Sequence, residues 1–249
     1  IKQDHKYQEN PNKYWQNALS GSITNGMIAT REISIEPTSD GKIRLLTGIE
    51  KDMAYQYWSY ETLHRFCMEA FQKFGFTEGE ANIIQDVLLT SDLYGIESHG
   101  MQRMVRYHKC IEKGMIKIDA KPEVVFETPI SAVIDAHDAM GQLVSHQAME
   151  MAIAKAKTAG VGIVSVRNSN HYGIAGYYAK MACKEGLMGF SCTNSEAIMV
   201  PTFGRKAMLG SNPIACAFPA EPYDFFFDAS TTVVTRGKLE MYNKMEKPL

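Results

Sequence analysis

From residue 131 onward, short apolar runs alternate with segments of helical periodicity. Runs of strand length lie at 131–136, 161–166, 187–192, 214–218 and 225–230. Helical segments at 142–160 and 173–186 separate the first three runs, and each ends at a glycine. Strands and helices that alternate bury their apolar faces against one another in layers. The sequence therefore predicts an α/β fold for residues 119–249.

Residues 59–113 show a different pattern, with three consecutive helical segments. The first, 59–75, carries one apolar stripe and stops at a glycine. The second, 77–95, opens on Thr77 with Glu80 three residues later, which is the spacing of a capping box. The third is expected to run from Ser98 to Lys113. These segments predict a small helical bundle over 53–118.

Residues 1–52 differ in composition from the rest and are interpreted as an extension of unclear origin. The opening stretch is polar and aperiodic, and two strands are expected at 26–37 and 41–46 around the turn "PTSDG". The chain starts with Ile1 and stops at "KMEKPL" without a finished element, so the sequence is interpreted as truncated.

Charge, hydropathy and cysteine content exclude several classes of protein. A net charge of −2 gives no reason to expect nucleic acid or an anionic membrane as a partner. No apolar stretch reaches spanning length, and no start resembles a secretion signal. The five cysteines are scattered without a C-x-x-C pair, which disfavours a zinc site and favours a reducing cytoplasm.

The glycine patterns of common nucleotide-binding loops are missing. No G-x-G-x-x-G follows any predicted strand, and no P-loop is present. A nucleotide bound by this chain would therefore be held in another geometry.

The stretch "GIESHGMQRMVRY" places three chemically useful side chains at helical spacing. His99, Arg103 and Tyr107 are four residues apart, so one helix starting at Ser98 would put them on one face. A guanidinium binds a carboxylate with two parallel hydrogen bonds, and an imidazole exchanges protons with a hydroxyl. The alternative is a solvated helix face without function.

The stretch "RNSNHYGIAGYY" places His171 between a predicted strand and the next helix. Ligand sites in α/β folds favour the carboxyl ends of strands, and the positive end of a helix favours a neutral imidazole. Three interpretations stay open: an acid/base group, a helix cap, and a metal ligand. The metal interpretation is disfavoured because no H-x-x-x-H or His–carboxylate pair surrounds His171.

Polar side chains also follow the later strands. Thr193, Asn194 and Ser195 come after the run 187–192, Asn212 precedes the run 214–218, and Asp228 and Ser230 close the last run. Each stretch alone is typical of an ordinary loop. Together they place hydrogen-bonding groups after several strands, which is how a pocket in an α/β fold is assembled.

Four blocks occur in a familiar order: "GIESHGMQRMVRY", "SNHYGIAGYYA", "GSNPIACAFP" and "FDASTTVVTRGK". In this order the chain, over residues 57–249, resembles the type-2 malate/L-lactate dehydrogenase family, which includes ureidoglycolate, sulfolactate and diketogulonate enzymes. The resemblance implies a reversible hydride transfer between NAD or NADP and a 2-hydroxy or 2-keto acid. It also implies a non-Rossmann mixed sheet for the cofactor domain and a homodimer.

The resemblance also implies roles for particular residues. His171 would be the catalytic acid/base beside the cofactor, His99 and Arg103 would face the substrate with Arg103 on its carboxylate, and Tyr107 would join them. The cofactor would be contacted by Ser195, Glu196, Asp228, Ala229 and Ser230. Position 196 is Glu where some relatives have Asp. The rival hypothesis is a truncated or fused chain that keeps part of the fold without activity.

Overall fold

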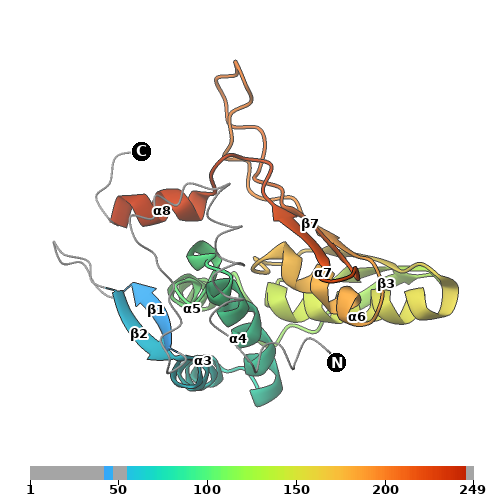
Figure 1. The fold of residues 1–249 in the computed structure, drawn as a ribbon, viewed down its shortest axis with the longest axis horizontal. Helices are drawn as coiled ribbons and strands as arrows, with labels where there is room; N and C mark the ends of the chain where they lie inside the picture. The colour runs from blue at the N-terminus through green and yellow to red at the C-terminus, as the bar shows by residue number, and fades with distance from the viewer. Residues whose placement is uncertain (1–41, 47–54, 245–249) are drawn as a thin grey trace.

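The computed structural model describes residues 42–46 and 55–244, and it is a mixed α/β molecule as the sequence predicts (Figure 1). Strand β1 (Lys42–Leu46) pairs antiparallel with β2 (Tyr55–Ser59). The strand expected at 41–46 is therefore present, and its partner β2 was not predicted. The strand expected at 26–37 lies outside the described residues. The domain boundaries proposed from the sequence stay predictions.

The helical part begins with α3 (Tyr60–Phe74) and α4 (Glu78–Leu93). Gly75 ends α3 with φ 110°, a left-handed conformation that glycine adopts without strain. The predicted capping box is present: Thr77 accepts from the backbone N–H of Glu80, and the Glu80 carboxylate accepts from that of Thr77. The apolar faces of these helices and of α5 (Arg103–Glu112) meet in one buried core.

The prediction of one continuous helix from Ser98 to Lys113 is wrong. A 3₁₀ turn, η1 (Glu97–His99), is followed by a turn, and α5 begins only at Arg103. The buried Asp92 carboxyl group accepts the backbone N–H of Met101 at 2.8 Å. A side chain at Gly100 would come within 1.7 Å of an Asp92 oxygen. Asp92 therefore diverts the chain here, and His99 does not share a helix with Arg103.

The first half of the α/β part is a mixed three-stranded sheet. Strand β4 (Ser131–Asp135) pairs antiparallel with β3 (Glu123–Glu127) and parallel with β5 (Ile163–Arg167). Helix α6 (Gly141–Ala159) connects β4 to β5 and packs on this sheet. Strand β3 was not predicted, because its residues are all exposed and lack the alternation that marks a half-buried strand.

The second half is an antiparallel sheet in which β7 (Ile214–Phe218) lies between β6 (Gly189–Cys192) and β8 (Phe225–Ala229). Helix α7 (Ala175–Lys184) covers one face, and the loop between β6 and β7 extends away from the sheet (Figure 1). The opposite face leaves Phe190 and Phe227 exposed. Helix α8 (Arg236–Lys244) packs on η1. None of the helices described is long and apolar enough to cross a membrane.

Candidate active site

His171 lies in the loop between β5 and α7, at the strand-to-helix corner that the sequence indicates. Its Nδ1 is 2.8 Å from the hydroxyl of Tyr107, which comes from α5. Its ring also stacks on that of His99 from η1, with 5.3 Å between centroids. The fold thus brings two imidazoles and a phenol together although they belong to three separate elements.

Gln142, in the first turn of α6, completes this cluster and was missed in the sequence. Its side chain is fully buried, and its Nε2 donates to the Tyr107 hydroxyl at 2.8 Å. The available signal was an amide between two apolar core positions, Met140 and Val144. A polar group in such a place needs a hydrogen-bond partner, and here the partner is a predicted site residue.

The cluster keeps both imidazoles neutral. Burial, followed by the positive charges of Arg103 and Arg106, lowers the pKa of His99 to about 4. Burial lowers the pKa of His171 well below its usual value, and His99, Arg103 and Arg106 act in the same direction. Burial also raises the pKa of Tyr107. His171 is therefore neutral as predicted, and its burial is the largest cause.

Arg103 is buried at the start of α5 and is held from two sides. Its Nε donates to the carbonyl of Ser98, and its Nη1 donates to the carboxylate of Glu240 on α8 at 3.0 Å. The hydroxyl of Ser98 lies 2.8 Å from Nδ1 of His99. A side chain at Gly237 would come within 2.3 Å of Arg103 Nη2, so this glycine lets α8 approach the guanidinium closely.

Two of the predicted cofactor-binding serines meet at a third one. The Ser195 hydroxyl is 3.1 Å from that of Ser211 and accepts the Ser211 backbone N–H at 2.8 Å. The Ser230 hydroxyl donates to the Ser211 carbonyl at 3.2 Å. The loops after β6 and β8 therefore join before β7, as expected for polar groups that follow neighbouring strands.

The other residues of the predicted cofactor set occupy two places. Asp228 accepts the backbone N–H of Gly176 at the start of α7, 2.7 Å away, and burial raises its pKa. Ala229 ends β8, where it pairs with Ile214. Glu196 forms an ion pair of 2.9 Å with Arg236 of α8.

Helix α8 connects the two groups of predicted site residues. One carboxylate oxygen of Glu240 binds Arg103, and the other lies 3.2 Å from Nε of Arg236. Because Arg236 also binds Glu196, a chain of ion pairs runs from the predicted substrate-binding guanidinium to the predicted cofactor loop. Neither Glu240 nor Arg236 was singled out in the sequence, because nothing in α8 itself indicates which residues it contacts.

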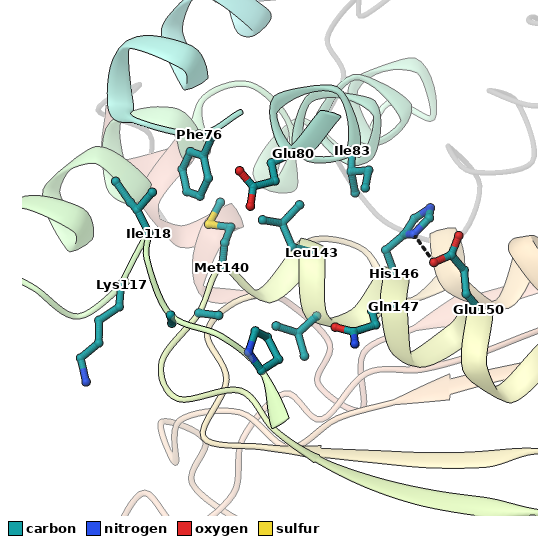
Figure 2. A pocket seen from close by; sticks show the side chains of 14 residues that line it. Phe76, Glu80, Ile83, Lys117, Ile118, Met140, Leu143, His146, Gln147 and Glu150 are labelled. Carbon is teal, nitrogen blue, oxygen red and sulfur yellow. Dashed lines mark ion pairs between the residues drawn. The ribbon is translucent and has the colours of Figure 1, made fainter. Parts of the chain in front are cut away.

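A separate hollow of about 230 Å³ lies between α4, the segment 117–122 and α6. Figure 2 shows its apolar wall, which includes Phe76, Met140 and Leu143, and the ion pair of His146 with Glu150 at its edge. No predicted site residue lines this hollow. Across residues 42–46 and 55–244, no group of three His, Cys, Asp or Glu side chains is arranged to hold a metal ion.

Comparison with known proteins identifies the family of the chain. A family model described as malate/L-lactate dehydrogenase matches residues 58–249. The chain is 46% identical over 189 residues to a malate dehydrogenase of Pyrococcus horikoshii, covering 76% of this chain and 52% of that one. It is 35% identical over 184 residues to a ureidoglycolate dehydrogenase (NAD(+)) of Escherichia coli O157:H7, covering 73% and 52%.

A similar fold is present in the crystal structure of malate dehydrogenase from Entamoeba histolytica. The TM-score is 0.74 at 36% identity, covering 83% of this chain and 55% of that one. The chain thus spans about half the length of the relatives that it matches. On these findings the chain belongs to the malate/L-lactate dehydrogenase family.

Proposed function

We propose that this protein is an oxidoreductase that transfers a hydride between NAD or NADP and a small 2-hydroxy or 2-keto acid. The observation that carries the proposal is a buried, neutral imidazole beside a buried guanidinium. His171 stacks on His99, and the Ser98 hydroxyl and carbonyl contact His99 and Arg103 respectively. We infer from these contacts that one small acid reaches both the acid/base group and the carboxylate-binding group.

The chemistry assigns a role to each of these side chains. Oxidation of a secondary alcohol removes the hydroxyl proton as the hydride leaves carbon, and an imidazole suits that proton transfer near neutral pH. In this proposal His171 exchanges the proton, and Arg103 binds the carboxylate so that the reacting carbon is oriented. His99 and Tyr107 complete the substrate side. A bound nicotinamide would supply the hydride chemistry itself.

The predicted cofactor residues, which α8 connects to Arg103, fit the polar parts of a dinucleotide. The β6–β7 loop brings the hydroxyls of Ser195 and Ser211 within 3.1 Å of each other, and the Ser230 hydroxyl, which follows β8, donates to the Ser211 carbonyl. Hydroxyls and loop N–H groups are the donors that a pyrophosphate or a ribose requires. In this proposal Ser195, Glu196 and the segment 228–230 contact the cofactor, in a non-Rossmann geometry that needs no glycine fingerprint.

The names of relatives indicate the substrate class. Relatives are named as malate and ureidoglycolate dehydrogenases, and the second name includes NAD(+). We therefore propose a hydroxy acid of similar size as the substrate, and NAD or NADP as the cofactor. We further propose a cytoplasmic homodimer. The exposed aromatic face of the second sheet supports self-association, since apolar patches of this kind mark interaction sites.

A panel of 2-keto acids tests the function directly. The chain is mixed with NADH or NADPH, and loss of absorbance at the reduced-nicotinamide band is followed for each acid. We expect turnover with at least one small 2-keto acid, and resistance of that turnover to chelators. The absence of turnover together with the absence of fluorescence enhancement of NADH and NADPH would support the rival hypothesis of an inactive chain.

A further inference from the structure

We propose that Gln142 is a positioning residue that acts through Tyr107 to keep the proton of the neutral His171 ring on Nε2. The ring would then offer an N–H donor to the carbonyl oxygen of a 2-keto acid. For a neutral ring, the tautomer follows from the hydrogen-bond directions around Nδ1. Its consequence for the substrate depends on the function proposed above.

Gln142 determines the direction of the hydrogen bonds that join it to Tyr107 and His171. An amide nitrogen can only donate, so the Tyr107 oxygen accepts from Gln142 Nε2 at 2.8 Å. The Tyr107 hydroxyl has one hydrogen, and its other neighbour is His171 Nδ1 at 2.8 Å. The hydroxyl hydrogen therefore points at Nδ1, and Nδ1 accepts.

A second donor faces the same ring nitrogen. The backbone N–H of Gly173 approaches His171 Nδ1 at 3.4 Å. A hydrogen on Nδ1 would meet both this N–H and the hydroxyl hydrogen of Tyr107. A neutral imidazole carries one ring hydrogen, so that hydrogen lies on Nε2. In the part of the chain that the structure describes, Nε2 has no hydrogen-bond partner and is free to bind a ligand.

The opposite orientation of the Gln142 amide is less favourable. As it stands, Gln142 Oε1 is buried without a hydrogen-bond partner among the described residues. Turning the amide would let Oε1 accept from Tyr107, but it would move the amide nitrogen with both its hydrogens to the position without a partner. It would also place a hydrogen of His171 Nδ1 against the Gly173 N–H. Unsatisfied buried donors are costly, so the present orientation is retained.

Because the ring is neutral, its tautomer determines whether Nε2 donates a hydrogen bond to the substrate or accepts one from it. Because burial lowers the pKa of His171, the ring carries a single hydrogen at neutral pH. With that hydrogen on Nε2, the ring donates to a carbonyl oxygen but has no lone pair there to accept the proton of an alcohol. The free protein is therefore prepared to donate a hydrogen bond to the keto acid, and binding of the hydroxy acid as a substrate requires the hydrogen bonds through Tyr107 to reverse.

The tautomer is measured by nitrogen NMR of the chain labelled with ¹⁵N-histidine at neutral pH. The signals of His171 are assigned by their disappearance in a His171→Asn variant. We expect a protonated chemical shift for Nε2 and an unprotonated one for Nδ1. The reverse assignment in the unmodified chain overturns the proposal, and this result needs no further variant.

A Gln142→Met variant then tests the role of the amide. Methionine keeps the volume and removes the donor, so we expect the two His171 tautomers to become mixed. We also expect the Michaelis constant for the keto acid to rise severalfold more than that for the hydroxy acid. A His171 spectrum identical to that of the unmodified chain contradicts the proposal.

The matched control is Gln85→Met in α4. Gln85 is equally buried, also has an unpartnered Oε1 among the described residues, and donates to Asn82 rather than to a site residue. We expect this variant to leave the His171 spectrum unchanged, and a change equal to that of Gln142→Met would overturn the proposal. If the tautomer is as expected but no 2-keto acid is reduced by the unmodified chain, the proposed function fails while the role of Gln142 stands.

Discussion

At the scale of single residues, the candidate site depends on side chains that the fold has removed from water. His171, Tyr107 and Gln142 are connected by hydrogen bonds of 2.8 Å, and Arg103 is almost fully buried. Electrostatic interactions are stronger where water is excluded, and they stabilise the charges that develop during a proton transfer. Changes to these side chains should therefore affect turnover and substrate binding in separable ways.

We expect His171→Ala to lower kcat by about 10²–10⁴-fold, the usual contribution of a general acid/base group. Binding of NADH or NADPH, measured by fluorescence, should change little, because the serine cluster is untouched. His146→Ala is the control, since His146 lies on α6 at the separate hollow and pairs with Glu150. Near-normal turnover of the His171 variant would remove this residue from the proposed role.

We expect Arg103→Lys to raise the Michaelis constant for the acid about tenfold or more, because lysine lacks the planar fork that binds a carboxylate with two hydrogen bonds. The control is the exposed Arg65→Lys in α3. Thermal unfolding of both variants separates a loss of substrate binding from a loss of stability. An unchanged Michaelis constant would contradict the assignment of Arg103 to the carboxylate.

At the scale of elements, the sequence predicted where α3 ends and where α4 begins, because the residues that cap these helices are close in sequence. The break between η1 and α5 was not, since it depends on Asp92 accepting a hydrogen bond from a residue nine positions later. Helix α8 is similar: its own sequence does not indicate that Glu240 binds Arg103, 137 positions away.

Helix α8 also leads to a prediction about affinity. The Glu240 carboxylate occupies Arg103 Nη1, so a substrate carboxylate has to compete with it. We expect Glu240→Gln to lower the Michaelis constant for the acid about three- to tenfold, because glutamine can still accept from Arg103 but no longer carries the charge that strengthens this partly exposed hydrogen bond. Glu185→Gln, which breaks the distant pair with Lys157, is the control. A raised Michaelis constant would instead make Glu240 a support for Arg103.

At the scale of the whole molecule, buried titratable groups give stability a defined dependence on pH. Burial raises the pKa of Asp92 from 3.8 to about 8, so the folded protein keeps a proton that the unfolded chain loses above pH 3.8. Its contribution to the free energy of unfolding is therefore complete below that value and is lost as pH rises to about 8. His99 and His171 have the opposite effect, because their lowered pKa makes the free energy of unfolding rise with pH. This rise ends near pH 6.5, the pKa of a histidine in the unfolded chain.

Above pH 6.5 the contribution of Asp92 is no longer opposed by the two histidines. We expect the free energy of unfolding to fall by on the order of 1–2 kcal/mol between about pH 6.5 and about pH 8, since one proton is worth about 1.4 kcal/mol per pH unit. Urea unfolding at the two pH values measures this fall, and Asp92→Asn should abolish most of it. A variant with the same fall would show that other groups cause it.

The sequence by itself determined the features that depend on neighbours along the chain. The alternation of strands and helices, the capping box at Thr77 and the position of His171 between β5 and α7 all follow from local periodicity and capping. The four blocks of sequence were enough to indicate the family. Backbone hydrogen bonds and apolar periodicity act over a few residues, so they can be predicted without knowing what a segment packs against.

Only the tertiary structure decided what these side chains touch. The contact of Gln142 with Tyr107, the approach of α8 to Arg103 and the turn at Gly100 all join residues that are distant in sequence or are determined by a buried group. Such contacts arise because a buried polar atom must find a partner wherever packing brings one. That requirement acts in three dimensions, and for this reason candidate site residues could be proposed from the sequence while their arrangement could not.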